Sequence, residues 1–166
     1  MARARGTTST TPTRPAPGVT LDDIDKAIIE VLQRDGRMPY TRVAGLIGLS
    51  EAATRQRVQR LTGSGVMQVV AVTDPLSLGF RRMAMVGVKI EGDVRAVAEA
   101  VAELPEVDYV VVVSGSFDLL LEIVCEDDAD LLRLLNDTLR AIPAVRSTET
   151  FTYLHLEKQT YAWGTR

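Results

Sequence analysis

Cysteine and histidine are almost absent from the 166-residue sequence, which contains one of each, Cys125 and His155. A disulfide needs two cysteines, and a zinc site of cysteine and histidine ligands needs more of them than this. The sequence contains no Walker or Gly-x-Gly-x-x-Gly pattern, and no recognisable pairing of a nucleophile with a base. We therefore expect no catalytic residue, no metal site and no cofactor, and we expect that the protein is not an enzyme.

Long apolar runs are also missing, and no stretch approaches the roughly 20 residues of a membrane-spanning helix. The first twenty residues carry arginines and threonines where a signal peptide would need an apolar segment. With 46% hydrophobic and 25% charged residues, the composition is that of an ordinary globular protein. We expect a cytoplasmic protein without a membrane partner.

The sequence also lacks an excess of positive charge. The net charge of -3 argues against an indiscriminate nucleic-acid binder, which would be strongly basic. The charge is unevenly distributed, however, because residues 1–20 carry +3, residues 21–74 carry no net charge and residues 75–166 carry -6. This division predicts two domains with different partners, preceded by a short basic segment.

The basic segment, residues 1–20, consists mainly of Thr, Ser, Pro, Arg and Ala. It has almost no large apolar side chain whose burial would offset the entropy lost on ordering. We expect a flexible N-terminal tail and assign it no function.

Residues 21–74 contain three amphipathic segments within 45 residues. The first carries aspartates in its first turn, where the helix dipole favours anions, and the last two are joined by the short segment Gly48-Leu49-Ser50. A short turn that contains glycine is typical of a helix-turn-helix. The predicted helices run from Thr20 to about Asp35-Gly36, from Tyr40 to Ile47, and from Ser50 to between Gly63 and Gly65.

The third helix has two different faces when it is plotted at about 100° per residue. Thr54, Val58 and Leu61 lie on one side, while small and long polar residues lie nearly opposite. Gln pairs with adenine and Arg with guanine in the major groove, and flanking arginines reach phosphates. A solvated polar face is the alternative interpretation, but the position in a trihelical unit favours DNA. The predicted DNA-binding residues are Ser50, Ala52, Ala53, Arg55, Gln56, Arg57, Gln59 and Arg60.

After Gly65 the segment Val66–Thr73 is apolar and β-branched, and Asp74-Pro75 ends it. Such a run predicts a strand, here a wing that leads out of the first domain. The first domain is therefore expected to be a winged helix-turn-helix with a linker strand, residues 21–74.

Residues 75–166 alternate between strand and helix patterns in the order β-α-β-β-α-β. This order is that of a ferredoxin-like domain, a four-stranded antiparallel sheet with both helices on one face. Val107–Val113 and Leu119–Cys125 are almost entirely apolar, so the open face is expected to pack against another subunit. The predicted strands are Met83–Ile90, Val107–Ser114, Phe117–Cys125 and Val145–Leu156, and the predicted helices are Val94 to before Pro105 and Asp128–Ile142.

An α+β chain of this organisation resembles the Lrp/AsnC family of bacterial and archaeal transcriptional regulators. The resemblance covers about Leu21 to Leu156. It is carried by Leu21-Asp22-Asp23-Ile24-Asp25, Asp35-Gly36-Arg37, Gly48-Leu49-Ser50, Arg57-Val58-Gln59-Arg60-Leu61, Gly65-Val66-Met67 and Val113-Ser114-Gly115-Ser116-Phe117-Asp118. It implies an N-terminal winged helix-turn-helix that binds operator DNA and a ferredoxin-like domain, called RAM, that dimerises and senses a small molecule. Tetramers, octamers or larger discs are also implied.

In that family, a Gly-x-x-Asp loop between the second and third strands of the sensing domain binds amino-acid effectors. Gly115 and Asp118 match this pattern, and Ser116 and Phe117 lie between them. Glycine exposes backbone N–H groups to a carboxylate, and an aspartate accepts an ammonium group. Thr148 and Thr150 match the Thr-x-Thr pattern of the last strand in the family. The identity of the ligand does not follow from the resemblance.

Two functions of different classes remain open. One is a sequence-specific transcriptional regulator that responds to an amino acid or a related metabolite. The other is an enzyme on the same architecture, because the sirohaem decarboxylases resemble this family; His155 would then need a catalytic role. The Gln- and Arg-rich outer face of the third helix favours the regulator.

Overall fold

The computed structural model describes residues 19–165. The predicted N-terminal tail, residues 1–20, lies outside the described residues apart from Val19 and Thr20. The described chain forms two compact units, one of residues 73–157 and one of residues 19–72 together with 158–165. No helix in residues 19–165 is long and apolar enough to cross a bilayer.

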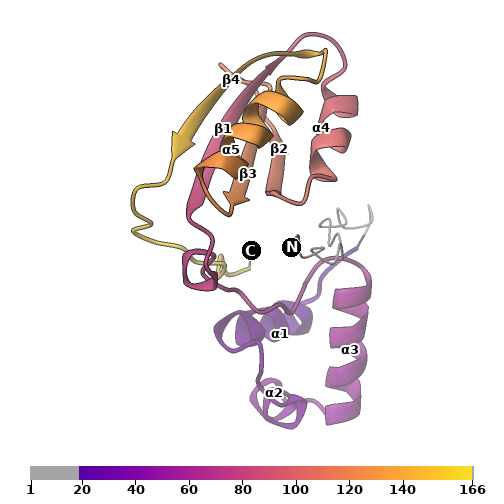
Figure 1. Ribbon diagram of the computed structural model, residues 1–166. Helices are drawn as coiled ribbons and strands as arrows, with labels where there is room; N and C mark the ends of the chain where they lie inside the picture. Colours follow the sequence, from indigo (N-terminus) through magenta and orange to yellow (C-terminus); the bar gives the residue numbers. More distant parts are fainter. Residues whose placement is uncertain (1–18, 166) are drawn as a thin grey trace. The chain divides into compact units, whose positions relative to one another are not determined.

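Three helices form the N-terminal unit (Figure 1): α1 (Asp23–Arg34), α2 (Tyr40–Ile47) and α3 (Glu51–Gly63). Helix α1 begins one turn later than expected because Asp22 is its N-cap, in a capping box with Asp25. Each helix buries one apolar stripe against the other two. The core of this unit consists of Ile28, Ile29, Leu32, Val43, Val58 and Leu61.

The connection between α2 and α3 is the expected helix-turn-helix turn. Gly48 ends α2 with φ 73°, in the left-handed region that favours glycine. Two residues later, the Ser50 hydroxyl accepts a hydrogen bond of 3.2 Å from Ala53 N and caps α3. This turn sets the direction in which α3 leaves α2.

The segment that follows α3 is not the predicted strand. Val66–Thr73 has no regular secondary structure, and the next element is a 3-10 turn, Leu76–Leu78. An isolated extended segment becomes a strand only when its backbone pairs with a neighbour, and sequence periodicity does not reveal whether one is present. The prediction of a wing is therefore wrong for this unit, although the helix-turn-helix itself is confirmed.

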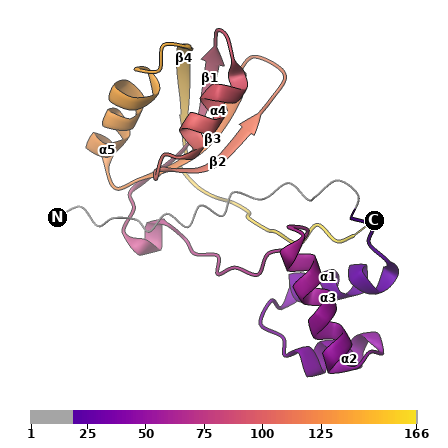
Figure 2. The ribbon, with the colours of Figure 1, turned by 90° about the vertical axis from the view of Figure 1, so that its right-hand side faces the viewer.

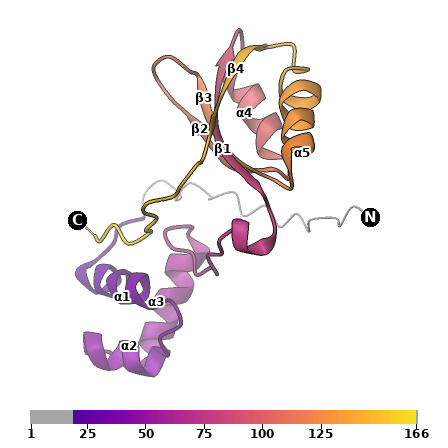
Figure 3. The same ribbon diagram turned by 60° about the vertical axis from the view of Figure 1, so that its left-hand side comes forward.

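The second unit has the predicted β-α-β-β-α-β order. Its elements are β1 (Arg82–Ile90), α4 (Val94–Ala102), β2 (Val107–Val112), β3 (Leu119–Cys125), α5 (Asp128–Arg133) with a π-helical continuation (Leu134–Leu139), and β4 (Val145–Thr152). The strands lie in the order β2-β3-β1-β4, with all three pairs antiparallel. Figure 3 shows α4 and α5 on the same side of this sheet. The ferredoxin-like expectation is confirmed.

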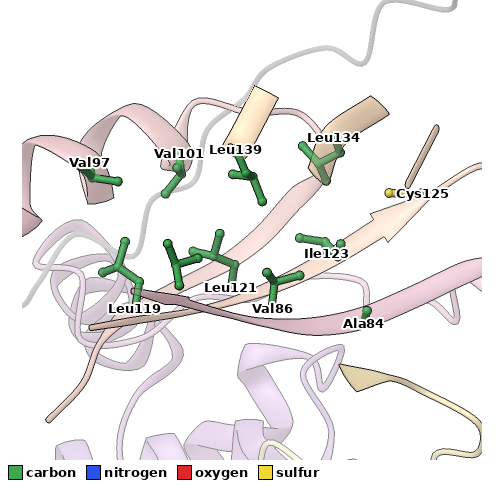
Figure 4. Packing of buried hydrophobic residues seen from close by; sticks show 11 residues of the cluster. Ala84, Val86, Val97, Val101, Leu119, Leu121, Ile123, Cys125, Leu134 and Leu139 are labelled. Carbon is green, nitrogen blue, oxygen red and sulfur yellow. The ribbon is translucent and has the colours of Figure 1, made fainter. Parts of the chain in front are cut away.

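The core of the second unit lies between the two helices and the sheet. Leu119 and Leu121 from β3 lie beneath Val97 and Val101 from α4, and Ile123 lies beneath Leu134 (Figure 4). The second helix was expected to continue from Asp128 to Ile142, but its last part is a π-helix. Because π-helical hydrogen bonds join residues five apart, this turn brings Leu134 and Leu139 over the same core, and both are fully buried.

The other face of the sheet has no helix on it (Figure 3). The strand register assigns it alternate residues, since successive side chains point to opposite faces. Many of these side chains are half-buried rather than buried, and most are apolar or aromatic. We call them the open face: Met83, Met85, Gly87, Lys89, Tyr109, Val111, Leu120, Glu122, Val124, Ser147, Glu149 and Phe151.

The C-terminal segment, residues 158–165, groups with the three-helix unit rather than with the sheet that it follows in the sequence. It returns to α1 in the three-helix unit, as the yellow trace in Figure 2 shows. Gly164 N donates to Gln33 Oε1 at 3.2 Å, and Thr165 Oγ1 donates to Glu30 Oε1 at 2.6 Å. Contacts across more than 130 residues have no local signal in the sequence.

Candidate nucleic-acid interface and ligand loop

Helix α3 presents the outer face that the sequence predicts. Thr54, Val58 and Leu61 are buried against α1 and α2. Ala52, Gln56, Gln59 and Arg60 are exposed on the opposite side, whereas Ala53 is half-buried. The two glutamine side chains have no hydrogen bond recorded within residues 19–165, so their amides face solvent and remain able to donate and accept.

Ser50 has a structural task at the start of α3. Its hydroxyl caps the helix through Ala53 N, and its carbonyl accepts from Thr54 Oγ1 at 3.0 Å. Glu51, the first residue of α3, pairs with Arg55, and the next two residues, Ala52 and Ala53, leave their side of the first turn free of bulk. A groove wall or phosphate can therefore approach the N-terminus of α3 closely.

Arg57 and Arg60 are bound to α1. Arg57 Nη1 donates to Asp22 Oδ2 at 2.7 Å and to Asp25 Oδ1 at 2.9 Å, and Arg60 Nη2 donates to Asp25 Oδ2. Asp25 is only 1% exposed, and its two carboxylate oxygens take one arginine each. Sequence reasoning missed this pairing because the partners lie more than 30 residues apart.

Asp25 is ionised because of these two arginines. Burial by itself would raise the pKa of Asp25, but the hydrogen bonds from Arg60 and Arg57 outweigh it and lower the pKa from 3.8 to about 2. The pKa of Arg57 is raised, chiefly by its hydrogen bonds to Asp22 and Asp25. The network fixes α3 against α1 at the level of the second and third turns of α3.

Arg55 is the more available of the flanking cations. Its Nη2 donates to Glu51 Oε1 at 2.9 Å in an exposed i,i+4 pair, and its guanidinium lies 5.2 Å from the centre of the Tyr40 ring. Exposed ion pairs of this kind contribute little stability. Arg55 can therefore exchange Glu51 for a phosphate at low cost.

The loop between β2 and β3, Gly115–Asp118, is anchored to β1. Asp118 Oδ2 accepts from Ile90 N at 2.8 Å and lies 3.8 Å from Lys89 Nζ, while Asp118 N donates to Val88 O at 2.9 Å. One carboxylate oxygen of Asp118 thus completes the hydrogen bonding at the end of β1. Gly115 (φ 148°) and Ser116 are exposed, so the first half of the loop faces solvent.

Phe117 turns from this loop onto the open face. Its ring lies over Gly87, where an added Cβ would come within 2.7 Å of ring atoms, and edge-on to Phe151 with centroids 6.2 Å apart. Sequence reasoning missed Gly87. A glycine inside an otherwise apolar strand is the signal for a close approach, and it is visible in Met83–Ile90.

Thr148 and Thr150 lie apart from Phe117. They lie on β4 and pair with Val88 and Val86 of β1, whose side chains are in the core, so they point to the helix-covered side of the sheet. Thr148 Oγ1 accepts from Arg140 Nε at 3.1 Å. The structure brings the predicted loop residues together, but it separates the two threonines from them by β1.

Tyr153 and Glu122 form a pair that the sequence analysis did not predict. Burial, and then the charge and hydrogen bond of Glu122, raise the pKa of Tyr153 to about 12. His155 and Glu157, in contrast, are exposed and in contact, with Nε2 and Oε2 3.1 Å apart. The acidic run before α5 is used locally: Asp127 caps the helix and Asp128 pairs with Arg82.

Comparison with known families identifies both units. Residues 21–62 match the AsnC-type helix-turn-helix domain, and residues 80–166 match an AsnC-type C-terminal dimeric alpha+beta barrel domain. The two matches leave only a short connection between them unassigned.

Individual relatives have the same organisation along nearly their whole length. An uncharacterised HTH-type transcriptional regulator of Pyrococcus abyssi is 36% identical over 146 residues, which cover 87% of this chain and 92% of the relative. The leucine-responsive regulatory protein of Salmonella typhimurium is 33% identical over 148 residues, 86% of this chain and 90% of the relative. A transcriptional regulator of Neisseria meningitidis, solved as a complex with L-Met, superposes with a TM-score of 0.75 at 28% identity, over 86% of this chain and 96% of that one.

Proposed function

Since this chain belongs to the Lrp/AsnC family of transcriptional regulators, which bind DNA through an AsnC-type helix-turn-helix, we propose that the outer face of α3 reads the bases of an operator. The observation that carries this proposal is the exposure of Gln56 and Gln59 one turn apart on the face opposite the core. Their amides match the bidentate edge of adenine in the major groove. Ala52 and Ala53 allow the close approach that such contacts need.

The arginines divide into two roles in this proposal. Arg55 holds a phosphate, since its contacts are an exposed pair with Glu51 and the Tyr40 ring, and neither involves a buried charge. Arg57 and Arg60 orient α3 through Asp25, and Arg60, which is 46% exposed, keeps one edge of its guanidinium toward solvent. Because Arg60 is paired with the buried Asp25, we expect Arg60→Ala to lower stability as well as DNA affinity.

We propose the loop Gly115–Asp118 as the site of an amino-acid effector. The solved Neisseria relative binds L-Met, and the Salmonella relative is named for its response to leucine, which supports an amino acid for this chain. The exposed backbone after Gly115 suits a carboxylate, and Asp118 suits an ammonium group. Because Asp118 Oδ2 is occupied by Ile90 N, the ligand would be received by Oδ1. Thr148 and Thr150 lie on the other side of β1 and are secondary candidates.

The open face is the proposed contact with a second copy of the chain. The matching family domain is a dimeric one, and this face is mostly apolar and has no helix on it. Larger assemblies, such as tetramers and octamers, would then be built from dimers. A DNA-bound regulator acts where the chromosome lies, so the proposed location is the cytoplasm. The regulator is favoured over the enzyme alternative because the relatives are named transcriptional regulators, and because His155 contacts only Glu157 among the described residues.

The experiment that tests the DNA interface measures fluorescence anisotropy of labelled DNA from upstream of the gene that encodes this chain. Scrambled DNA of equal length is the reference, and the salt concentration is varied. The wild type is expected to prefer the upstream sequence, and its affinity is expected to fall steeply with salt. Gln56→Ala and Gln59→Ala are each expected to reduce the preference by about 10-fold, since a bidentate pair contributes about 1–3 kcal/mol of discrimination.

Gln68→Ala is the matched control, because Gln68 is an exposed glutamine outside α3. It is expected to leave both affinity and preference unchanged. Circular dichroism verifies that each variant is folded. If both α3 variants keep the full preference of the wild type, the outer face of α3 does not read bases and the assignment is wrong.

A further inference from the structure

Phe117 occupies a position that the family assignment does not explain. It is part of the exposed loop between β2 and β3, yet its half-buried ring lies on the open face of the sheet rather than in solvent. The ring lies over Gly87, in the middle of β1, where the Cβ of any other residue would come within 2.7 Å of three ring atoms. Glycine at this position therefore creates the space that the ring fills.

The ring also contacts a residue two strands from its own. Gly87 pairs with Leu120 on β3 and with Glu149 on β4, so the ring lies above the centre of the sheet. Its edge-on partner, Phe151, belongs to β4, with a centroid distance of 6.2 Å and an interplanar angle of 78°. Phe151 is 45% exposed, so the aromatic pair forms part of the surface of the open face.

The residue after Phe117 fastens the same loop to the end of the same strand. Asp118 N donates to Val88 O, and Asp118 Oδ2 accepts from Ile90 N. Two adjacent loop residues therefore contact β1. The Phe117 ring packs on its open face, and Asp118 forms hydrogen bonds with its backbone. A change in the backbone at the exposed Gly115 is expected to move the Phe117 ring, because only one residue separates the two.

We propose that Phe117 is the positioning residue through which the Gly115–Asp118 loop controls the shape of the open face, and hence the contact with a second copy of this chain. The proposal rests on the proposed function, in which the loop receives the effector and the open face forms the dimer. When the loop rearranges, the ring leaves or re-enters the space over Gly87. The surface that Phe117 and Phe151 present to the partner changes with it.

The link can be tested without any ligand, through a change in the loop. Gly115 has φ 148° and no atom within 4 Å of an added Cβ, so Gly115→Val strains the loop backbone without a clash. Self-association is measured by sedimentation equilibrium for the full chain, with Phe117 and with Phe117→Ala. With Phe117, Gly115→Val is expected to weaken association by about fivefold or more; with Phe117→Ala, by less than about twofold.

Gly92→Val is the matched control, because Gly92 has φ 116°, is exposed and also has no neighbour within 4 Å, but lies in another loop. It is expected to leave association unchanged. Gly87→Ala displaces the ring directly, so it is expected to weaken association and to be rescued by Phe117→Ala. If Phe117→Ala fails to fold by circular dichroism, Phe117→Leu takes its place, because it keeps an apolar side chain but shortens its reach.

The outcomes separate this inference from the proposed function. Equal weakening by Gly115→Val in both backgrounds, or none in either, overturns the role of Phe117. Calorimetric titration of each standard L-amino acid into the wild type and Asp118→Asn tests the ligand loop independently. Absence of binding contradicts the effector site alone, while a monomer at all concentrations contradicts the dimer and the link together.

Discussion

Asp25 shows how one buried carboxylate organises a DNA-binding unit. It is 1% exposed, belongs to the capping box that begins α1, and receives Arg57 and Arg60 from α3. A buried charge is stable only when it is paired and hydrogen-bonded, and here both oxygens are used. The orientation of α3 therefore depends on a residue that is too deeply buried to contact DNA.

Loss of this carboxylate is expected to destabilise the three-helix unit. Asp25→Ala leaves two arginines without their shared partner, which is expected to lower the free energy of unfolding by about 3 kcal/mol. Asp23→Ala is the control. Asp23 is exposed and its contact with Lys26 Nζ is long, at 3.9 Å, so its loss is expected to change the free energy of unfolding by less than about 0.5 kcal/mol. Urea denaturation followed by circular dichroism measures both values.

The effect of Asp25→Ala on stability is also expected to depend on pH. The pKa of Asp25 falls from 3.8 to about 2 on folding, so the carboxylate stabilises the folded state by about 2 kcal/mol at neutral pH. Since the folded-state pKa is the lower one, this contribution is complete above pH 3.8 and is lost as the pH falls toward 2. The difference in stability between wild type and Asp25→Ala should shrink over that range; a constant difference would contradict the assignment.

At the scale of elements, the helix-turn-helix depends on two glycines with opposite roles. Gly48 has φ 73° at the end of α2, where a side chain is strained, whereas Gly45 lies inside α2 on its exposed side with no neighbour within 4 Å of an added Cβ. Gly48→Ala is expected to destabilise the unit by about 1 kcal/mol. Gly45→Ala is expected to stabilise it by about 0.5–1 kcal/mol, because alanine favours helix.

Thermal unfolding measured on both variants is a direct test of this difference. Opposite shifts of the midpoint confirm that the turn, rather than glycine content in general, sets the geometry. Shifts in the same direction would show that the left-handed residue is not what ends α2.

Sequence periodicity was most informative for elements whose signals are local. The bounds of α2 follow from Pro39 and Gly48, and the start of α3 follows from Ser50, since caps lie next to the residues they cap. The prediction of a strand at Val66–Thr73 was wrong because a strand needs a pairing partner, and the sequence pattern does not reveal whether one is present. The π-helical turn after Arg133 was not predicted, because the core that it packs against is formed by residues from other elements.

The candidate site shows the same division. The outer face of α3 could be predicted from helical spacing, and its exposure agrees with the structure. The binding of Arg57 and Arg60 to Asp25 could not, because opposite charges 32 and 35 residues apart give no periodic signal. Gly87 had a recognisable signal, a glycine in an apolar strand, but its partner Phe117 lies in the loop between β2 and β3, and nothing in the sequence links the two.

At the scale of the whole molecule, the open face is expected to set the oligomeric state. Leu120→Glu places a carboxylate on this half-buried face beside Glu122, and burial of an unpaired charge costs several kcal/mol. Self-association is expected to weaken by at least about a hundredfold. Leu132→Glu is the matched control, since Leu132 is 60% exposed on α5.

Sedimentation velocity distinguishes the two variants. A slower species for Leu120→Glu alone supports the open face as the contact between copies. Unchanged sedimentation for Leu120→Glu would place the contact elsewhere on the molecule.

The return of residues 158–165 to α1 has a practical consequence for dissecting this regulator. The three-helix unit is discontinuous, because the segment bound to Gln33 and Glu30 comes from the far end of the chain. A DNA-binding fragment made by cutting near residue 74 would lose that segment, and an affinity tag fused after it would lie next to α1. A fair dissection adds the segment back as a separate peptide, and tags belong at the N-terminus.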